Sequence, residues 1–581
     1  MPRPVQGLIA TLSRIAGSAA FAYTSVLLIQ ARVMWGVWSR RDLSAGDSAD
    51  HFQRAAAWAD HLELDFLISP LYGFLLGSLL WAVEDVYATM IAQRVLIALA
   101  VAAGVLLVMR RLLTPGIAWV LAVWWALMPV NYDTPTELHL FAVIPVLAAT
   151  WVASTHQSRA SRSVVLGILL SAAVLIRNEL LIAAIVWAAI WAVYEIRAAR
   201  RPQARAVLRA LAVAVALPVL VAAALGGLSV IASDQHDVAD ELKEKDSFAF
   251  CQHYAVGWQQ RHGDFSQTGW ARCNDHTQRD FDQRQPTMLE AFAENPGAVG
   301  RHLTWNASLV PYGLQLSLLN RTSGPEDRNP DYIPVDTGSG LALAGSMLLL
   351  ALLAIGGTLL WRDRAYWWNE WLRPRAWGWA VLASITAMSL WVMLTIRPRP
   401  AYLFALAIAL LAVLGMCAMA IVRRRPQLGD LRAALPPLAL AALIALPSHY
   451  RDGYETPQLT EGRSLKDAIQ RVEPFAGRLD ADTTLLARFP DEICSYIDPE
   501  RSCAGKSLAE LAERPPAQAS SAWMSEEDVD LLYLGEQDFA AGFPHEEVSV
   551  LEAKGWRPVD AEGTLPSGWV LLEAPAGARR Q

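Results

Sequence analysis

Long apolar blocks, separated by short polar segments, dominate the first 446 residues of the chain. A helix needs roughly 20 mostly apolar residues to cross the hydrocarbon core of a bilayer. The blocks predict membrane-spanning helices at residues 8–37, 88–108, 117–130, 138–154, 164–176, 180–194, 210–231, 341–361, 377–396, 401–422 and 431–446. Another block, residues 71–83, is too short for a span and is predicted to lie along the membrane surface. The pattern therefore predicts a polytopic α-helical membrane protein with about eleven transmembrane helices.

Arginines between the blocks set the predicted orientation, because cytoplasmic loops carry an excess of Lys and Arg. Counting residues 71–83 as a span would place Arg110 and Arg111 outside and would reverse every later loop. Without that span, the cytoplasmic side receives the arginines at positions 110, 111, 159, 162, 197, 200, 201, 205, 209, 362, 364, 373, 375 and 423–425. We therefore expect a multi-pass protein of the cell inner (plasma) membrane, with a cytoplasmic N-terminus and external loops at residues 38–87 and 232–340.

From residue 447 onward the pattern becomes that of a soluble α/β domain. Residues 464–472 have helical spacing, and residues 483–489, 529–534 and 569–573 have the composition of buried strands. In the external loop 232–340, we expect a helix at residues 287–295 and an aromatic stretch, residues 305–312, on the bilayer surface. The chain is thus predicted to consist of a transmembrane domain, 1–446, and an external (periplasmic or extracellular) α/β domain, 447–581.

Composition supports the membrane assignment. Hydrophobic residues make up 54% of the chain and charged residues 18%, and the mean hydropathy is +0.26. The net charge of -7 is uninformative as a total. Arginines cluster between the apolar blocks, whereas acidic residues concentrate in the two long soluble stretches, and this asymmetry is what indicates topology.

Four cysteines lie in segments predicted to be external. Cys251 and Cys273 are in loop 232–340, Cys494 and Cys503 are in the C-terminal domain, and Cys417 lies within a span. The external side is oxidising, so we expect the disulfides Cys251–Cys273 and Cys494–Cys503. Four cysteines allow three connectivities, and free thiols remain the alternative.

A polar segment, residues 46–52 (Gly-Asp-Ser-Ala-Asp-His-Phe), follows the first span and opens a short amphipathic helix. At the water boundary its carboxylates can meet a lipid-carried substrate, so Asp47 and Asp50 are candidate catalytic residues. The structural alternatives are that Asp47 is the N-cap of a helix beginning near Ala49, and that Asp50 is a first-turn acid favoured by the helix dipole.

Charged residues at the ends of other spans are further candidates. Glu137 precedes a span and is a third catalytic candidate, with a helix-capping role as the alternative. Arg177 and Glu179 are predicted to lie at the tip of a helical hairpin, at a depth where charges are costly. They are candidates for substrate binding, and the alternative is that they pair with each other.

Three more arginines are candidates for substrate binding. Arg397 and Arg399 lie in a short external turn, Arg-Pro-Arg-Pro, and either anchor to lipid headgroups or bind a phosphate. Arg94 lies deeper in its helix and either binds phosphate or extends its charge to the interface. The histidines show no compact ligand spacing, so no metal site is predicted. The glycosylation motifs at Asn306 and Asn320 matter only in a host that glycosylates them.

The order of these features resembles the GT-C superfamily of membrane glycosyltransferases. The resemblance lies in a first span, an acidic external loop, and the segments 69–72 (Ser-Pro-Leu-Tyr), 92–96 (Ala-Gln-Arg-Val-Leu), 131–141 and 175–179 (Leu-Ile-Arg-Asn-Glu). These features are similar to those of the branch of the superfamily that contains the protein O-mannosyltransferases and the lipid A aminoarabinose transferase. The resemblance covers about residues 8–194, extends to the later spans only by architecture, and does not extend to the C-terminal domain.

The resemblance implies an inverting transferase that moves a hexose or pentose from a polyprenyl-phosphate donor to a glycan, lipid or protein acceptor on the external face. Asp47 would be the base, Asp50 and Glu137 would shape the acceptor side, and the candidate arginines would stabilise the departing phosphate. The implied partners are this donor, the acceptor and membrane lipids, with no nucleic acid.

Two points stay open within this resemblance. The spacing Asp-x-x-Asp at residues 47–50 departs from the Asp-x-Asp pattern of metal-dependent relatives, so no cofactor is certain and a divalent metal is an open question. The alternative function is a non-catalytic transporter of lipid-linked glycans or a cell-envelope assembly protein that uses the same cavity for binding. A transporter should contain internal repeats, and none stands out in the sequence.

Overall fold

The computed structural model describes residues 11, 14–15, 17–36, 47–62, 69–83, 85–128, 137–198, 212, 214–224, 227, 238–264, 269, 273–331, 335–424, 434–445, 469, 471–472, 474–475, 483–487, 490–497, 503–508, 524, 528–535, 545–559 and 569–575. The chain divides into two compact units. Unit 1 comprises Met1–Trp35, Phe66–Pro70 and Arg94–Glu455, and unit 2 comprises Gly36–Asp65, Leu71–Gln93 and Thr456–Gln581.

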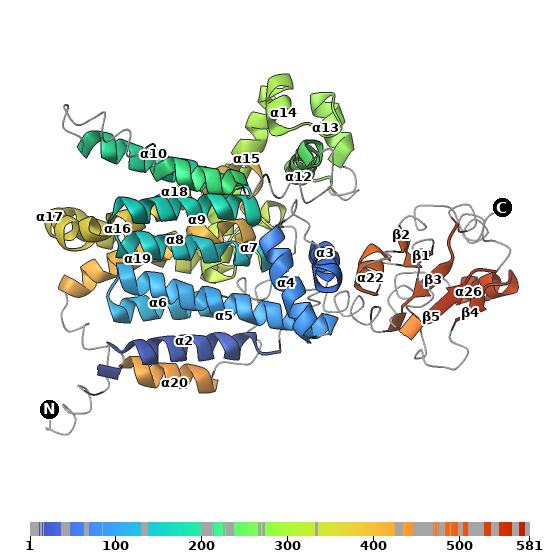
Figure 1. The fold of residues 1–581 in the computed structure, drawn as a ribbon, viewed down its shortest axis with the longest axis horizontal. Coiled ribbons are helices and arrows are strands. Elements are labelled where there is room, and N and C mark those ends of the chain that lie inside the picture. The colour runs from blue at the N-terminus through green and yellow to red at the C-terminus, as the bar shows by residue number, and fades with distance from the viewer. Residues whose placement is uncertain are drawn as a thin grey trace. The chain divides into compact units, whose positions relative to one another are not determined.

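Unit 1 is a bundle of apolar helices that lie side by side (Figure 1). Its helices are α2 (Ala19–Met34), α5 (Val86–Leu112, in this unit from Arg94 onward), α6 (Pro115–Leu127), α7 (Glu137–Phe141), α8 (Val143–Thr155), α9 (Arg159–Leu175), α10 (Leu180–Ala198), α16 (Gly340–Arg362), α18 (Ala376–Thr395), α19 (Pro400–Arg424) and α20 (Leu435–Ala445). Each of the eleven predicted spans overlaps helical residues, the seventh through residues 214–224. The prediction of a polytopic helical membrane protein is confirmed.

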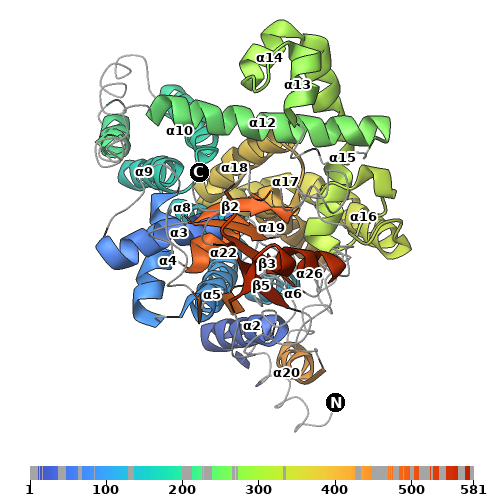
Figure 2. The same cartoon turned by 90° about the vertical axis from the view of Figure 1, so that its right-hand side faces the viewer.

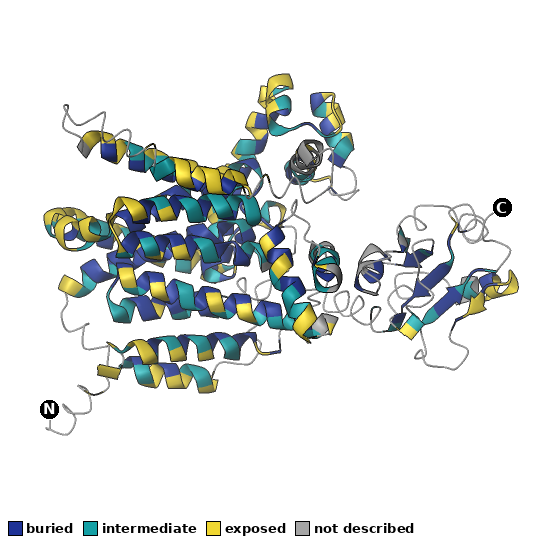
Figure 3. Cartoon of the chain, viewed as in Figure 1, coloured by how far each residue is buried: buried dark blue, intermediate teal, exposed yellow. Residues whose placement is uncertain are grey.

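Six helices in the described part are long and apolar enough to cross a membrane. They are Ala88–Leu112, Leu138–Thr155, Leu180–Arg197, Gly340–Arg362, Arg364–Thr395 and Pro400–Arg424. Helix α19 is the most enclosed of them and packs against α15 (Pro296–Leu319), α16 and α18. Helix α10 instead buries Ala183, Ala184 and Trp187 on one face while Leu181 and Ile185 are exposed (Figure 3). Apolar residues on both faces are expected where one face meets lipid rather than water.

Several of the arginines that the sequence assigns to the cytoplasmic side lie, within the described residues, at one end of this bundle. Arg111, at the end of α5, donates from Nε to the Thr155 hydroxyl oxygen at the end of α8 (3.2 Å). Arg375, before α18, donates from Nε to the Arg111 carbonyl oxygen (2.7 Å), and Arg424, at the end of α19, pairs with Asp363 (2.6 Å). The ends of α5, α8 and α18 are therefore joined at this arginine-rich end, and the end of α19 is joined there to the end of α16, which Asp363 follows.

A group of helices follows the seventh span and belongs to the predicted external loop. It contains α12 (Val238–His262), α13 (Cys273–Phe281), α14 (Met288–Glu294), α15 and the short 3₁₀ helix η4 (Glu326–Arg328). The Cys251–Cys273 disulfide joins α12 to α13, as predicted. The helix expected at residues 287–295 is α14, which begins with a capping box in which Thr287 and Glu290 satisfy each other's backbone N–H groups. The lengths of α12 and α15 were not predicted.

Unit 2 contains a five-stranded sheet in the order β2-β1-β3-β5-β4. Its strands are β1 (Thr484–Ala487), β2 (Ala504–Ser507), β3 (Leu531–Leu534), β4 (Arg557–Pro558) and β5 (Val570–Glu573), accompanied by α22 (Pro490–Ile497) and α26 (His545–Ala553). Strands β2, β1 and β3 are parallel, and β5 and β4 are antiparallel to their neighbours. The three predicted strands are confirmed, whereas β2 and β4 were missed.

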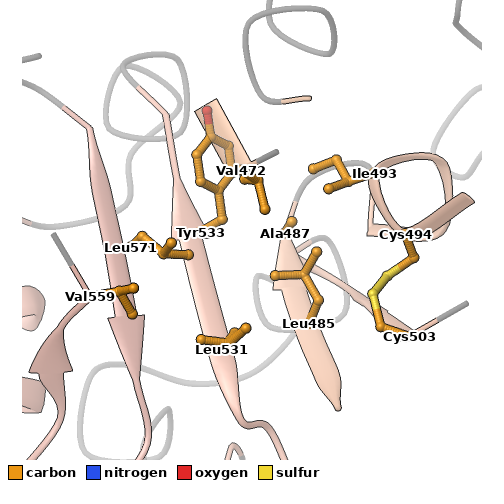
Figure 4. Packing of buried hydrophobic residues seen from close by; sticks show 10 residues of the cluster. All are labelled: Val472, Leu485, Ala487, Ile493, Cys494, Cys503, Leu531, Tyr533, Val559 and Leu571. Carbon is orange, nitrogen blue, oxygen red and sulfur yellow. A yellow bond between two sulfur atoms is a disulfide. The ribbon is translucent and has the colours of Figure 1, made fainter. Parts of the chain in front are cut away.

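The sheet carries apolar side chains on both faces, which accounts for its nearly continuous apolar strands. On one face, Leu485, Leu531 and Leu571 pack together beside the Cys494–Cys503 disulfide, which links α22 to the start of β2 (Figure 4). This second predicted disulfide is also confirmed. The predicted domain boundary at residues 446–447 lies outside the described residues and stays a prediction.

The helix that contains the acidic residues of the predicted first external loop is part of unit 2. This helix, α3 (Asp47–His61), packs against α22, where the Phe52 and Tyr496 rings lie 4.8 Å apart (Figure 2). On another side, Trp58 donates its indole N–H to Ser78 of α4 (Pro70–Val83) over 3.1 Å, and a Cβ at Gly77 would collide with the Ala55 carbonyl oxygen. The α3 backbone is therefore fixed by both a neighbouring helix and the C-terminal part of the chain.

Candidate functional site

A pocket with about 430 Å³ of empty space, which includes open solvent, lies in unit 1, at the end of the bundle opposite the arginine-rich end. Its apolar wall comes from α8, α18 and α19, through Val143, Val146, Met388, Val392, Phe404 and Ala405 among others. Its polar lining consists of four side chains: His139 of α7, Arg177 and Glu179 of the turn between α9 and α10, and Tyr402 of α19. Such a pocket can receive a ligand with one polar and one apolar part.

The turn between α9 and α10 confirms the predicted hairpin and brings Arg177 and Glu179 to the pocket. The Arg177 backbone N–H donates to the Ala172 carbonyl oxygen (3.0 Å) and so ends α9, while the Leu181 and Ile182 N–H groups donate to the carbonyl oxygens of Asn178 and Glu179. Arg177 donates from Nε to Glu179 Oε2 (3.1 Å), and a second contact joins the same two groups. The pairing that the sequence left open is therefore present, and both side chains also line the pocket.

Tyr402 is the residue around which the polar lining is arranged. Its ring lies 4.9 Å from the ring of His139 in an edge-on arrangement, measured between centroids. The guanidinium carbon atoms of Arg177 and Arg399 lie 5.6 Å and 5.8 Å from the ring centroid. Two cations near one aromatic ring are each attracted by its π-face but repel one another. Each of these guanidinium groups also pairs with a carboxylate, Arg177 with Glu179 and Arg399 with Asp331.

Arg397 and Arg399 fasten the α18–α19 turn to the loop that follows η4. Arg397 is completely buried and donates from Nε to the Pro330 carbonyl oxygen (2.8 Å) and from its terminal nitrogen to the Asn329 carbonyl oxygen. Arg399 donates from Nε to Asp331 Oδ1 (2.9 Å), and Asp331 is buried. Burial lowers the pKa of Arg397 to about 9, opposed by Asp331, so this guanidinium remains charged at neutral pH.

The same turn is held from the other side by α15. The last carbonyl groups of a helix have no partner inside the helix. The Asn306 amide nitrogen donates to the carbonyl oxygens of Leu394 (2.9 Å) and Ile396 (3.0 Å), and His302 Nε2 lies 2.9 Å from the carbonyl oxygen of Thr395. These two buried side chains thus complete the end of α18 and fix the direction in which Arg397 leaves it.

This arrangement changes the reading of the two glycosylation motifs. Asn306 is completely buried and uses its amide nitrogen on α18, and Asn320 is buried at the end of α15 with a left-handed backbone conformation. An oligosaccharide on either side chain would be incompatible with this packing. The sequence motifs are therefore not exposed acceptor sites in the folded chain.

The histidines around this turn make its stability sensitive to acid. Burial lowers the pKa of His302 to about 4, and burial together with the Arg399 and Arg397 charges holds the pKa of His253 well below its usual value. The unfolded chain has ordinary histidine pKa values near 6.5. Between these values the unfolded state binds more protons, so the free energy of unfolding should fall as the pH falls through this window.

We expect the thermal unfolding midpoint to decrease between about pH 7 and about pH 5 through this linkage. His302→Gln keeps a hydrogen-bond donor for Thr395 but removes the titrating group, so its midpoint should decrease less over the same range. His262→Gln, which changes an exposed histidine, is the matched control and should follow the wild type. Parallel pH profiles for wild type and His302→Gln would contradict the assignment.

The structure describes the side chain of only one of the other predicted site residues. Arg94 is buried within α5. Asp47 and Asp50 lie in α3 and Glu137 at the start of α7, and their side chains lie outside the described residues. Their predicted convergence with Arg177 on one pocket therefore stays a prediction. Among the described residues, no group of three His, Cys, Asp or Glu side chains could hold a metal ion.

Sequence reasoning missed His139 and Tyr402. Both lie within two or three residues of predicted candidates, since His139 follows Glu137 and Tyr402 follows the Arg-Pro-Arg-Pro segment. An aromatic or imidazole side chain just inside a span, beside a charged candidate, was the available signal. The signal was ambiguous, because aromatic residues are common at membrane interfaces for other reasons.

No protein-family model matches the chain, and no curated protein matches it. Solved structures that resemble it include the oligosaccharyltransferase AglB of Archaeoglobus fulgidus with an inhibitory peptide and a dolichol-phosphate (14% identity, TM-score 0.44, 96% of this chain and 76% of that chain). An Archaeoglobus fulgidus oligosaccharyltransferase with Zn and sulfate also resembles it (13% identity, TM-score 0.43, 89% of this chain and 68% of that chain). Apo ArnT from Cupriavidus metallidurans is a third such structure (11% identity, TM-score 0.39, 97% of this chain and 100% of that chain).

These identities and TM-scores are low, so the likeness says nothing about which residues of this chain form a site. The solved structures that the chain resembles are GT-C superfamily membrane glycosyltransferases, the superfamily that the sequence motifs resemble.

Proposed function

We propose that this chain is an integral membrane glycosyltransferase that transfers a sugar from a polyprenyl-phosphate donor to an acceptor at the external face of the membrane. The observation that carries this proposal is the pocket with Arg177 and Tyr402 in its polar lining and an apolar wall on α8, α18 and α19. A polyprenyl phosphate has the same division, with an anionic head and a long apolar chain. Its phosphate would lie beside Arg177 while the chain follows the apolar wall.

The candidate arginines would differ in what they do for this donor. Arg177 lines the pocket and would donate to a phosphate oxygen in competition with Glu179. Arg399 lies against Tyr402 and would add to the positive potential at the departing phosphate. Arg397 donates to backbone carbonyl oxygens and would act through the turn that it holds. Arg94 is a further candidate for the donor phosphate.

The proposed reaction is a single displacement at the anomeric carbon of the donor sugar. Asp47 takes the proton of the acceptor hydroxyl as that oxygen forms its bond to the anomeric carbon, and Asp50 and Glu137 orient the acceptor. The bond between the anomeric carbon and the phosphate oxygen breaks, and its electron pair leaves with the polyprenyl phosphate. Attack from the opposite face inverts the anomeric configuration. A divalent metal held by the first-loop acids is compatible with this scheme but is not required by it.

This function requires a particular orientation in the membrane. The arginine-rich end would face the cytoplasm of a cell inner membrane, and the pocket, α12 to α15 and the C-terminal α/β domain would face outward. The acceptor would then be a glycan, a lipid or a protein of the cell envelope. Helix α22 contacts both the C-terminal sheet and α3, the helix that contains Asp47, and through it this domain would influence acceptor binding.

Replacing Arg177 by glutamine is expected to raise the KM for the lipid-linked donor by about ten- to a hundredfold, the usual contribution of a hydrogen bond to a charged group. The substitution removes the positive charge that pairs with Glu179 in the same pocket. Donor kinetics with purified protein in detergent would measure the change. Arg284→Gln, at an exposed arginine outside the pocket, is the control. An unchanged donor KM would remove Arg177 from the proposed donor site.

The proposed function can be tested without knowing the sugar. Mass spectrometry of cell-envelope glycans and lipid-linked sugars should show one sugar missing from an acceptor, and its lipid-linked donor accumulating, in cells that lack the gene. Wild type should restore the product and Asp47→Asn should not. Restoration by Asp47→Asn, or an unchanged envelope in the deletion, would contradict the proposal. A transporter would instead alter the side of the membrane on which the intact donor is found.

A further inference from the structure

The segment that joins α16 to α18, residues 361–377, has an unusual composition. Five of the 23 tryptophans of the chain lie within these 17 positions, together with four arginines and only two acidic residues. The tryptophans are at positions 361, 367, 368, 371 and 377, and the arginines at 362, 364, 373 and 375. Tryptophan and arginine together favour the boundary between lipid headgroups and acyl chains. The segment lies at the arginine-rich end of the bundle.

The segment is held in a fixed position on the bundle. It forms α17 (Arg364–Trp367), a π-helical turn η5 (Trp368–Leu372) and a 3₁₀ turn η6 (Arg373–Arg375). Its Arg375 donates to the Arg111 carbonyl oxygen of α5 (2.7 Å), and its Asp363 pairs with Arg424 of α19 (2.6 Å). These contacts neutralise one of its two acidic residues and present the rest of the segment as an ordered surface.

Three arginines of this surface have N–H groups that are available to a ligand. Arg362, Arg364 and Arg373 are exposed, and their side chains make no hydrogen bond or ion pair with the described residues. The Arg364 guanidinium carbon lies 5.1 Å from the centroid of the Trp361 ring. A cation–π contact of this kind uses no N–H group as a hydrogen-bond donor, so the guanidinium N–H groups remain available, and this planar group can bind two phosphate oxygens at once.

Two tryptophans are exposed beside these arginines. Trp361 and Trp368 have exposed fractions of 71% and 56%, whereas Trp367 between them is buried. Exposed indoles at the end of a membrane bundle place their rings at the level of the lipid glycerol groups. The surface therefore combines unpaired cationic donors with aromatic rings suited to the membrane interface.

We propose that residues 361–377 bind the headgroups of anionic phospholipids in the leaflet that borders this end of the bundle. Arg362, Arg364 and Arg373 donate to the lipid phosphates, and Trp361 and Trp368 lie between the glycerol groups. Anionic lipids are selected because a zwitterionic headgroup carries a cation of its own, which opposes the arginines. This inference does not depend on the proposed transfer reaction.

The test uses the full-length protein in detergent micelles, titrated with phosphatidylglycerol or phosphatidylcholine, with retained lipids counted by native mass spectrometry. Wild type should retain phosphatidylglycerol in preference to phosphatidylcholine. The triple variant R362Q/R364Q/R373Q should bind phosphatidylglycerol about a hundredfold more weakly, since each arginine contributes about fivefold at an anionic surface. The matched triple variant R321Q/K554Q/R557Q removes three exposed cations elsewhere and should behave as wild type.

A second measurement on the same protein uses phospholipids brominated next to the headgroup, which quench nearby tryptophan fluorescence. Brominated phosphatidylglycerol should quench wild type more than the variant W361F/W368F, and an excess of inorganic phosphate should not remove the difference. Equal retention of the two lipids by wild type, or an unchanged preference in R362Q/R364Q/R373Q, would overturn the proposal. Removal of binding by inorganic phosphate would instead show a free-phosphate site and would also overturn it.

Discussion

Replacing Asp47 with asparagine is expected to lower the rate of sugar transfer by about a hundredfold to ten-thousandfold, the range typical of a lost general base. Asparagine keeps the size and the hydrogen-bonding oxygen of aspartate, and the two are nearly equal at helix N-termini. The fold of α3, which begins at Asp47, should therefore be unchanged. The variant thus separates the proposed catalytic function from the capping function that the sequence left open. Turnover with purified wild type and variant would measure the loss.

Asp60→Asn is the matched control, because it makes the same change of charge near the other end of the same helix. Its turnover should stay within about threefold of wild type, since Asp60 lies about three helical turns from Asp47 along α3 and has no part in the proposed reaction. If Asp47→Asn retained most of its activity, the proposed base would be wrong. If the two variants lost activity equally, the effect would belong to the charge of α3 rather than to Asp47.

Removing the Glu195 carboxylate, by Glu195→Ala, is expected to lower the free energy of unfolding by about 3–5 kcal/mol, the usual cost of breaking a buried ion pair from one side. Glu195 of α10 pairs with Arg162 of α9 (2.8 Å) and accepts a hydrogen bond from the Trp191 indole (3.2 Å). The Arg162 guanidinium carbon in turn lies 4.6 Å from the centroid of the Trp377 ring of α18. Without Glu195, the buried Arg162 charge at the junction of three helices has no counter-ion among these groups.

Arg159→Ala is the control for this prediction, since Arg159 also pairs with Glu195 (2.8 Å) but its side chain is 46% exposed. Loss of the Arg159 side chain should lower the free energy of unfolding by about 1 kcal/mol or less, as is usual for exposed ion pairs. Unfolding in mixed micelles, followed by circular dichroism, would compare the two variants. Similar losses for both would show that the stability lies in the number of charges rather than in the burial of Arg162.

The arrangement of the pocket explains why it could be only partly predicted. Arg177 and Glu179 were accessible to sequence reasoning, because charged residues are rare between apolar blocks and so attract attention. Tyr402 and His139 were not accessible in this way, since what marks them as pocket residues is the contact between the His139 ring of α7 and the Tyr402 ring of α19. The sequence distance between them is more than two hundred residues, and no local pattern encodes such a meeting. Asn306 shows a related limit: its glycosylation motif says nothing about burial, and the packing of α15 on α18 buries the side chain.

The sequence by itself determined the helical membrane architecture, three strands of the C-terminal sheet and both disulfides. These follow from local properties: the length and spacing of apolar residues, and cysteines on the side predicted to be oxidising. Only the tertiary structure decided that α3 packs with α22, that Arg397 donates to backbone carbonyl oxygens, and that two guanidinium groups lie near the Tyr402 ring. Each of these depends on contacts between residues far apart in the chain, and such contacts are selected by shape and burial across the whole fold rather than by any one segment.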